Sequence, residues 1–102
     1  MWKLSEKKGM VQMNWQINAK REIIQRKYMK DLETILAKLK ITPKEIEPEI
    51  TTTVKFYKIN IKSIHVNKDL TIKLLEASGY IVKKWVTDHT ESFIVVMVNK
   101  EI

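Results

Sequence analysis

Cysteine is absent from this chain of 102 residues, and glycine and proline occur only twice each. Without cysteine the chain has no disulfide, no thiolate zinc site and no thiol nucleophile. Because its glycines stand alone at Gly9 and Gly79, it has no glycine-rich loop that could hold a phosphate group. Nucleotide sites of the Walker and Rossmann types are therefore excluded.

Long apolar runs are also missing. The longest is Phe93–Val98, which has six residues and is far too short to cross a bilayer. The opening residues Met1–Glu6 lack the apolar core of a signal peptide. We therefore expect an intracellular protein that is not bound to a membrane.

The composition is that of an ordinary globular protein, with 44% hydrophobic and 30% charged residues. A chain of this length is expected to form a single domain, 1–102. The net charge of +7 is unevenly spread: residues 1–42 hold ten basic against four acidic residues, and residues 43–102 hold nine against eight. The basic character therefore belongs to the N-terminal part.

The first two predicted elements are a strand and a long helix. Residues Val11–Asn18 alternate strictly between apolar and uncharged polar, which predicts a strand buried on one face. A helix is expected from Ala19 to Lys40, with Asn18 as its N-cap. At 100° per residue its apolar residues fall in one arc: Ile24, Tyr28, Met29, Leu32, Ile35, Leu36 and Leu39. Basic residues occupy the opposite arc: Lys20, Arg26, Lys27, Lys30 and Lys38.

The middle of the chain is harder to interpret. Pro43 and Pro48 bracket an acidic stretch, so residues 41–52 are either an edge strand or an extended connection. Residues 51–62 are strand-like, but the apolar parity changes after Phe56, which predicts a bulge or a strand buried on both faces.

The last three elements have clearer boundaries. Asn67 is expected to cap a helix over Lys68–Ser78, and Gly79 follows as its left-handed terminator. Strands are predicted for Tyr80–Thr87 and for Phe93–Val98, and the second is apolar on both faces, as in a central strand. The apolar face of the helix is expected to contain Leu70, Leu74 and Ala77.

Two segments resemble each other, which suggests an internal repeat. Trp15–Lys20 resembles Tyr57–Lys62, and a spacing near 39 residues continues the match. We therefore expect related strand–helix–strand halves at 10–50 and 53–98, although two such units can also match by chance. The resulting fold is α+β: an antiparallel sheet with two helices on one face, in ferredoxin-like order plus an extra C-terminal strand.

No group of residues predicts catalysis, a metal site or a cofactor. Histidine occurs only at His65 and His89, and His89 lies beside Asp88 in a predicted turn. No spacing brings the two histidines together with carboxylates. The alternating Glu45, Glu47 and Glu49 are typical of a solvated edge strand. We therefore expect a protein that is not an enzyme.

Two binding functions remain. Methionine and tryptophan, which are frequent at interfaces, cluster near the N-terminus. The first hypothesis is an interaction module that binds a peptide, a protein partner or its own copy through a sheet edge or the groove between the two halves. The expected contact residues are Trp2, Met10, Met13, Trp15 and Tyr57.

The alternative is a nucleic-acid-binding protein that uses the basic arc of the first helix. Lys20, Arg26, Lys27, Lys30 and Lys38 could contact a phosphate backbone. The chain has only two arginines, Arg21 and Arg26, and arginine makes most of the forked contacts to bases. Such binding would therefore be independent of base sequence. A lysine-rich solvent face also has a purely solubilising explanation.

From its opening Met1-Trp2-Lys3-Leu4 to its closing Val98-Asn99-Lys100-Glu101-Ile102, the chain resembles a small orphan protein of an archaeal filamentous virus of the Acidianus group. The resemblance rests on 14 Ile, 17 Lys, no Cys and almost no Gly, and covers the whole chain. It implies a viral protein made in the cytoplasm of a hyperthermophilic host.

Overall fold

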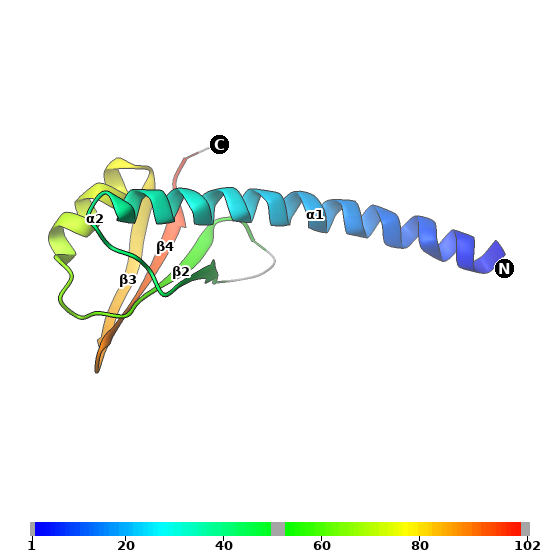
Figure 1. Ribbon diagram of the computed structural model, residues 1–102. Coiled ribbons are helices and arrows are strands. Elements are labelled where there is room, and N and C mark those ends of the chain that lie inside the picture. Colours follow the sequence, from blue (N-terminus) through cyan, green and yellow to red (C-terminus); the bar gives the residue numbers. More distant parts are fainter. Residues whose placement is uncertain (1, 50–52, 101–102) are drawn as a thin grey trace.

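The computed structural model describes residues 2–49 and 53–100, and for residues 2–18 it describes the backbone alone. Within these residues two helices lie over a four-stranded antiparallel sheet (Figure 1), in the order α1 (Trp2–Ala37), β1 (Glu45–Pro48), β2 (Phe56–Ile61), α2 (Lys68–Ala77), β3 (Tyr80–Asp88) and β4 (Glu91–Val98). The predicted α+β class, with an antiparallel sheet and two helices on one face, is confirmed. The molecule measures 60 × 29 × 20 Å because α1 extends well beyond the sheet (Figure 1).

The sheet has the strand order β1-β2-β4-β3, and each neighbouring pair is antiparallel. A row of apolar residues crosses it: Ile46 pairs with Ile59, Ile59 with Ile94, and Ile94 with Trp85. Strand β4 is central, as the two apolar faces of Phe93–Val98 predicted. Residues Glu45–Pro48 form an edge strand, which decides the open question about the acidic stretch between the prolines.

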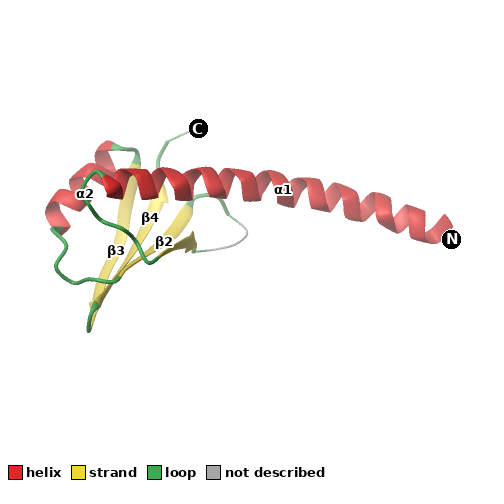
Figure 2. Cartoon of the chain, in the orientation of Figure 1, coloured by secondary structure: helices red, strands yellow, loops and turns green. Residues whose placement is uncertain are grey.

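The N-terminal prediction was wrong. Residues Val11–Asn18 are helical, so Asn18 caps nothing and α1 runs unbroken from Trp2 to Ala37 (Figure 2). Alternating polarity predicts a strand only if a neighbouring strand can pair with it. Proline is absent from the whole segment and Gly9 costs only about 1 kcal/mol, so the backbone hydrogen bonds of the helix continue through it.

The ferredoxin-like order is consequently not found. The chain is helix–strand–strand twice, and its last strand is central and not appended to an edge. Because β2 and β4 are neighbours at the centre of the sheet, a twofold axis between them would exchange the two helix–hairpin units. The internal repeat of 10–50 and 53–98 stays a prediction, with helix–strand–strand in place of strand–helix–strand as its unit.

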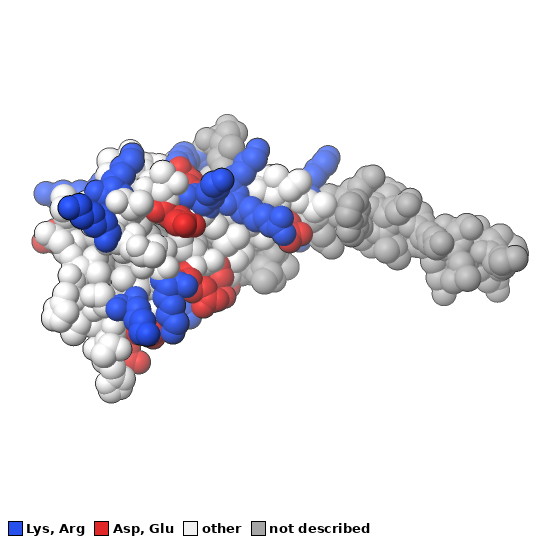
Figure 3. Space-filling view, in the orientation of Figure 1, with Lys and Arg blue, Asp and Glu red and all other residues white. Residues whose placement is uncertain are grey.

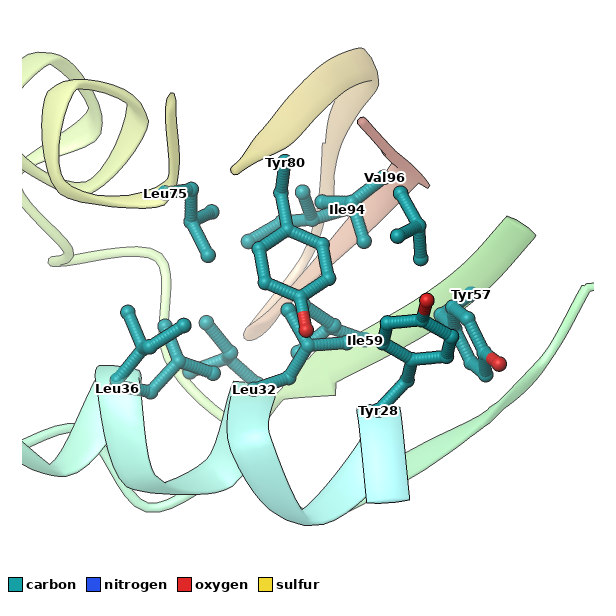
Figure 4. Close-up of a cluster of buried hydrophobic side chains, with 12 residues drawn as sticks. Tyr28, Leu32, Leu36, Tyr57, Ile59, Leu75, Tyr80, Ile94 and Val96 are labelled. Carbon is teal, nitrogen blue, oxygen red and sulfur yellow. The ribbon is translucent and has the colours of Figure 1, made fainter. Parts of the chain in front are cut away.

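The core lies between the helices and one face of the sheet (Figure 4). Leu32 and Leu36 of α1 and Leu75 of α2 are fully buried there. They pack against the buried set of strand residues: Tyr57, Ile59, Ile61, Tyr80, Ile94, Val96 and Val98. Burial of these side chains provides the main driving force for the sheet and helices to associate.

The buried faces of the helices differ from the predicted ones at three residues. Ile24 and Leu70 are exposed by 38% and 49%, and Ala77 is also exposed. In α2 the buried residues are Thr71 and Leu75. Thr71 can replace an apolar residue because its Oγ1 donates to the carbonyl of Asn67 at 2.7 Å, which leaves only its methyl group to face the core.

The boundaries of α2 follow the predicted signals. The backbone N–H of Leu70 donates to Oδ1 of Asn67 at 3.1 Å, which confirms the cap. Gly79 follows with φ of 95°, a left-handed conformation that favours glycine. At the end of α1, Lys40 takes a similar conformation with φ of 59°, three residues after the helix ends.

Strand β2 contains no bulge. Its six residues pair in continuous register with β4, and Tyr57, Ile59 and Ile61 alternate into the core. Phe56 therefore points to the other face of the sheet, so the change of parity reflects an apolar residue on each face. The predicted bulge was wrong, and β2 is not buried on both faces either, because Phe56, Lys58 and Asn60 are only half-buried.

Candidate interaction surface

The sheet has one face under the two helices and one face without a helix. Residues paired across an antiparallel sheet share a face, so the registers assign every strand residue to one side or the other. The face opposite the helices consists of Glu45 and Glu47 from β1, Phe56, Lys58 and Asn60 from β2, Glu91, Phe93, Val95 and Met97 from β4, and Ile81, Lys84, Val86 and Asp88 from β3. We call this set the open face.

Large apolar side chains occupy the centre of the open face. Phe56 pairs with Met97 and Met97 with Ile81, which gives an apolar row across three strands. Phe93 and its partner Val86 form a second row, and Val86 is 41% exposed. The other four are half-buried by their neighbours within the sheet. A contiguous apolar surface of this kind is typical of a binding site.

Charged residues lie around this apolar centre in an ordered way. Pairing places Glu47, Lys58, Val95 and Lys84 in one row from β1 to β3. The ammonium of Lys58 lies 5.3 Å from the centroid of the Phe93 ring, within cation–π range. In this row the acidic side chain is therefore at the β1 edge and a lysine is at the β3 edge, whereas Asp88 and Glu91 form an acidic pair at the β3–β4 hairpin.

A shallow depression of about 290 Å³ marks the middle of the open face. Its walls are Glu49, Lys58, Lys84, Val86, Phe93 and Val95. They come from both central strands and both edges, so the depression lies where the two helix–hairpin units meet.

Both edges of the sheet carry features that discourage strand addition. Strand β1 has only four residues and ends in Pro48, which has no backbone N–H. Strand β3 is nine residues long, but its register shifts between Val82 and Lys84, and Lys83 at the shift is exposed. Short strands, proline, bulges and lysine all block edge-to-edge pairing. The face of the sheet is thus better suited to a partner than either edge.

The residues that the sequence predicted as a partner site are not brought together on this surface. Tyr57 is completely buried in the core and points away from the open face. Trp2, Met10, Met13 and Trp15 all lie on the half of α1 that extends past the sheet (Figure 1). Their side chains lie outside the described residues, so their role stays a prediction, without the strand edge on which it was based.

The basic residues of α1 are exposed, as predicted: Lys20, Arg26, Lys27, Lys30 and Lys38. Arg26 donates to Glu22 at 2.8 Å one turn earlier, so part of its charge is neutralised locally. Figure 3 shows basic side chains spread over α1 with acidic ones between them. The helix therefore presents a mixed surface with a basic excess.

All three tyrosines of the chain meet in the core (Figure 4). The ring centroids of Tyr28 and Tyr57 are 5.9 Å apart, and those of Tyr28 and Tyr80 are 6.5 Å apart. Burial, and to a smaller extent Tyr28, raises the pKa of Tyr57 to about 12. Burial and the hydrogen bond to Asp31 raise the pKa of Tyr80 as well. Both hydroxyls are therefore protonated at neutral pH.

Asp31 ties this cluster to the C-terminal segment. Its Oδ2 accepts hydrogen bonds from the hydroxyl of Tyr80 at 2.7 Å and from the ammonium of Lys100 at 2.6 Å. Burial raises the pKa of Asp31, but these two hydrogen bonds and the charges of Lys100 and Lys38 outweigh it and lower the pKa. The carboxylate holds together α1, β3 and the segment after β4.

The two histidines lie in the connections between elements, His65 between β2 and α2 and His89 between β3 and β4. Both His65 and His89 are exposed, and Nε2 of His89 is 3.5 Å from Oδ1 of its neighbour Asp88. Among the residues that the structure describes, no three His, Asp or Glu side chains are grouped so that they could hold a metal ion. In residues 2–49 and 53–100, no helix combines the length and hydropathy of a membrane span.

The open face was missed by the sequence reasoning, although two signals pointed to it. Phe56 broke the parity of its strand, and Phe93–Val98 was apolar on both sides. Such a pattern is typical of a strand covered by structure on both faces. Only the placement of both helices on the same face leaves Phe56, Phe93 and Met97 uncovered.

The architecture defines an α+β protein with one helix-covered and one open sheet face. No family model, no curated protein and no solved structure matches the chain.

Proposed function

We propose that this protein is a non-enzymatic interaction module that binds a protein partner or its own copy on the open face. The observation that carries the proposal is the apolar centre of that face, where Phe56, Phe93, Val95, Met97 and Ile81 come together with no helix over them. Bringing a partner against them removes apolar surface from water, which favours association.

The surface also has the composition of a binding site in other respects. Aromatic and methionine side chains are enriched at interfaces, and the open face contains three of them, Phe56, Phe93 and Met97. The depression gives a partner side chain a place to insert. Lys58, Lys84 and the β1 glutamates form a polar surround of the kind that accompanies an apolar interface centre.

Site-directed photo-crosslinking in the cells that naturally make the protein tests this proposal. A photoreactive phenylalanine analogue is placed at the position of Val86, which is on the open face and 41% exposed. The matched control carries it at the position of Leu70, which is 49% exposed on α2. Both substitutions replace an accessible apolar side chain, so the fold should tolerate both.

We expect a discrete crosslinked species from position 86 that is absent from position 70. Mass spectrometry of the adduct then identifies the partner as another protein or as the same chain. Equal crosslinking from both positions, or none from position 86, would contradict the proposal. Circular dichroism of both variants confirms that the helices and sheet are intact.

A second candidate function is electrostatic, sequence-independent binding of nucleic acid along α1. Its supporting observation is the exposure of Lys20, Lys27 and Lys38. At 100° per residue these three fall within an arc of about 20°, so they form a line along the helix. Each phosphate that such lysines neutralise releases counterions, which makes binding strongly dependent on salt.

Fluorescence anisotropy with labelled single- and double-stranded DNA tests this candidate. At low salt the wild type should bind, and the affinity should fall steeply between 50 and 200 mM salt, by about tenfold or more. The double variant Lys27→Glu/Lys30→Glu should bind much more weakly. The control Lys68→Glu/Lys73→Glu makes the same charge change on exposed positions of α2. If both doubles lose affinity equally, only the net charge matters and α1 is not a site.

A further inference from the structure

The row Glu47-Lys58-Val95-Lys84 of the open face is polarised from one edge of the sheet to the other. Glu45 and Glu47 lie at the β1 edge, and Glu49, which follows β1, lines the depression beside them. Lys84 lies at the opposite edge on β3. The apolar residues lie between Glu47 and Lys84, and the acidic pair Asp88 and Glu91 lies beyond them at the β3–β4 hairpin. A surface with this pattern is complementary to itself if the partner is turned so that unlike edges meet.

The strand order defines which rotation achieves this. A twofold axis parallel to the strands reverses the order β1-β2-β4-β3, so β1 of one copy lies over β3 of the other. An axis in the sheet plane but perpendicular to the strands would place β1 over β1 and bring the glutamates together. Like charges that face each other disfavour the second arrangement.

The first arrangement also matches the rows of the open face. In the row Glu47-Lys58-Val95-Lys84, Glu47 would face Lys84 of the second copy, and Lys58 would lay its aliphatic stem over Val95. In the neighbouring row Phe56 would face Met97. Aligned sheets pack about 30° apart and about 10 Å from each other, which leaves these partners within reach.

Other partner classes fit this face less well. A nucleic acid would meet the carboxylates of Glu45, Glu47 and Glu49 beside the aromatic residues, against two lysines, Lys58 and Lys84. An anionic membrane surface would meet the same carboxylates. The α1 lysines lie on the other side of the molecule and cannot offset them. Closed twofold dimers are also the commonest protein assemblies.

The size of the face indicates the strength of the association. Four strands spaced about 4.8 Å apart, with about six residues each, give a face of roughly 400 Å² per subunit. An interface of roughly 800 Å² in total is smaller than the about 1,200–2,000 Å² of stable specific interfaces and falls in the range of weak, transient ones. A weak, reversible dimer with a Kd on the order of micromolar to millimolar is therefore expected.

We infer that a second copy of this chain occupies the open face, in a twofold sandwich whose axis runs parallel to the strands and pairs Glu47 with Lys84 of the partner. This inference rests on the proposed function and specifies its occupant. The axis makes the contact isologous, so each dimer contains two such pairs. Within one chain the two residues are on opposite edges of the sheet and are separated by β2 and β4.

Sedimentation velocity of the purified full chain, from about 1 µM to 1 mM, tests the inference through charge reversal. Glu47 and Lys84 are both exposed, so the fold should tolerate Glu47→Lys and Lys84→Glu. In the dimer each single variant would place like charges opposite each other at both of the symmetry-related contacts. Each should raise the dimer Kd by about tenfold or more. The double variant Glu47→Lys/Lys84→Glu restores unlike pairs and should return the Kd to within about threefold of the wild type. Glu76→Lys, exposed on α2, is the matched control and should not change it.

Three results would overturn the inference. They are a wild type that stays monomeric at 1 mM, a dimer that is insensitive to both single reversals, and a double variant that is no better than the singles. Crosslinking from position 86 to a different protein would also overturn it while leaving the proposed function in place. Absence of any specific adduct at that position would remove both.

Discussion

Leu32→Ala tests the packing of α1 on the sheet most directly. Leu32 is completely buried between α1 and the strands, and its removal leaves a cavity in a core made by residues distant in sequence. Replacing a leucine at such a site by alanine costs about 3 kcal/mol. The free energy of unfolding of a domain of this size is about 5–15 kcal/mol, so the substitution removes a large fraction of its stability.

Urea denaturation followed by far-ultraviolet circular dichroism measures this loss. With a slope of about 1.5 kcal/mol/M, the midpoint should fall by about 2 M, and Tm should fall by roughly 12–24 °C. Leu70→Ala makes the same chemical change at a residue that is 49% exposed, and should cost less than about 1 kcal/mol. The sequence placed both leucines on buried helix faces. Equal losses, or a larger loss for Leu70→Ala, would refute the arrangement of the helices on the sheet.

Three further predictions concern single contacts. Asn67→Ala removes the α2 cap and should lower the free energy of unfolding in urea by about 1 kcal/mol. Asn67→Asp keeps an acceptor oxygen and should retain most of the stability. Equal losses for the two variants would exclude the capping role. Gly79→Ala should lower the free energy of unfolding by about 1–2 kcal/mol in the same measurement. The reason is that φ is 95° and the added Cβ would lie 2.6 Å from the Lys100 side chain. An unchanged urea midpoint would contradict this. Asp31→Asn should cost less than about 1 kcal/mol, since the carboxylate is 38% exposed. The pKa of Asp31 is lower in the folded than in the unfolded protein. Its carboxylate should therefore stabilise the fold fully at pH values above the unfolded pKa of 3.8, and this stabilisation should be lost as the pH falls through the folded pKa. Urea unfolding of both proteins from pH 2 to 7 checks this, and a difference that grows towards acid pH would contradict it.

The C-terminal half of the fold was predictable because its signals are local. Asn67 caps a helix, Gly79 ends it, and the apolar character of Phe93–Val98 indicates a central strand. Each signal depends on backbone sterics or on hydrogen bonds within a few residues of the position concerned. The structure places these elements within one or two residues of their predicted boundaries.

The N-terminal half was not predictable in the same way. The alternation in Val11–Asn18 suits a strand, but a strand needs a partner, and the sheet order leaves none for it. The parity change at Phe56 was ambiguous for a related reason. A bulge and an apolar residue on each face produce the same pattern, and only the pairing register of β2 separates them.

The features of the candidate site also differ in whether the sequence alone could predict them. The sequence by itself determined the α+β class, the absence of thiol chemistry, the exposure of the α1 lysines and the cap and terminator of α2, because composition and local geometry suffice for them. Only the tertiary structure decided that Tyr57 is core and that Phe56, Phe93 and Met97 are surface. Which face of a sheet is covered depends on where two helices pack, and that is set by contacts between residues far apart in the chain, such as Leu32 with the strands.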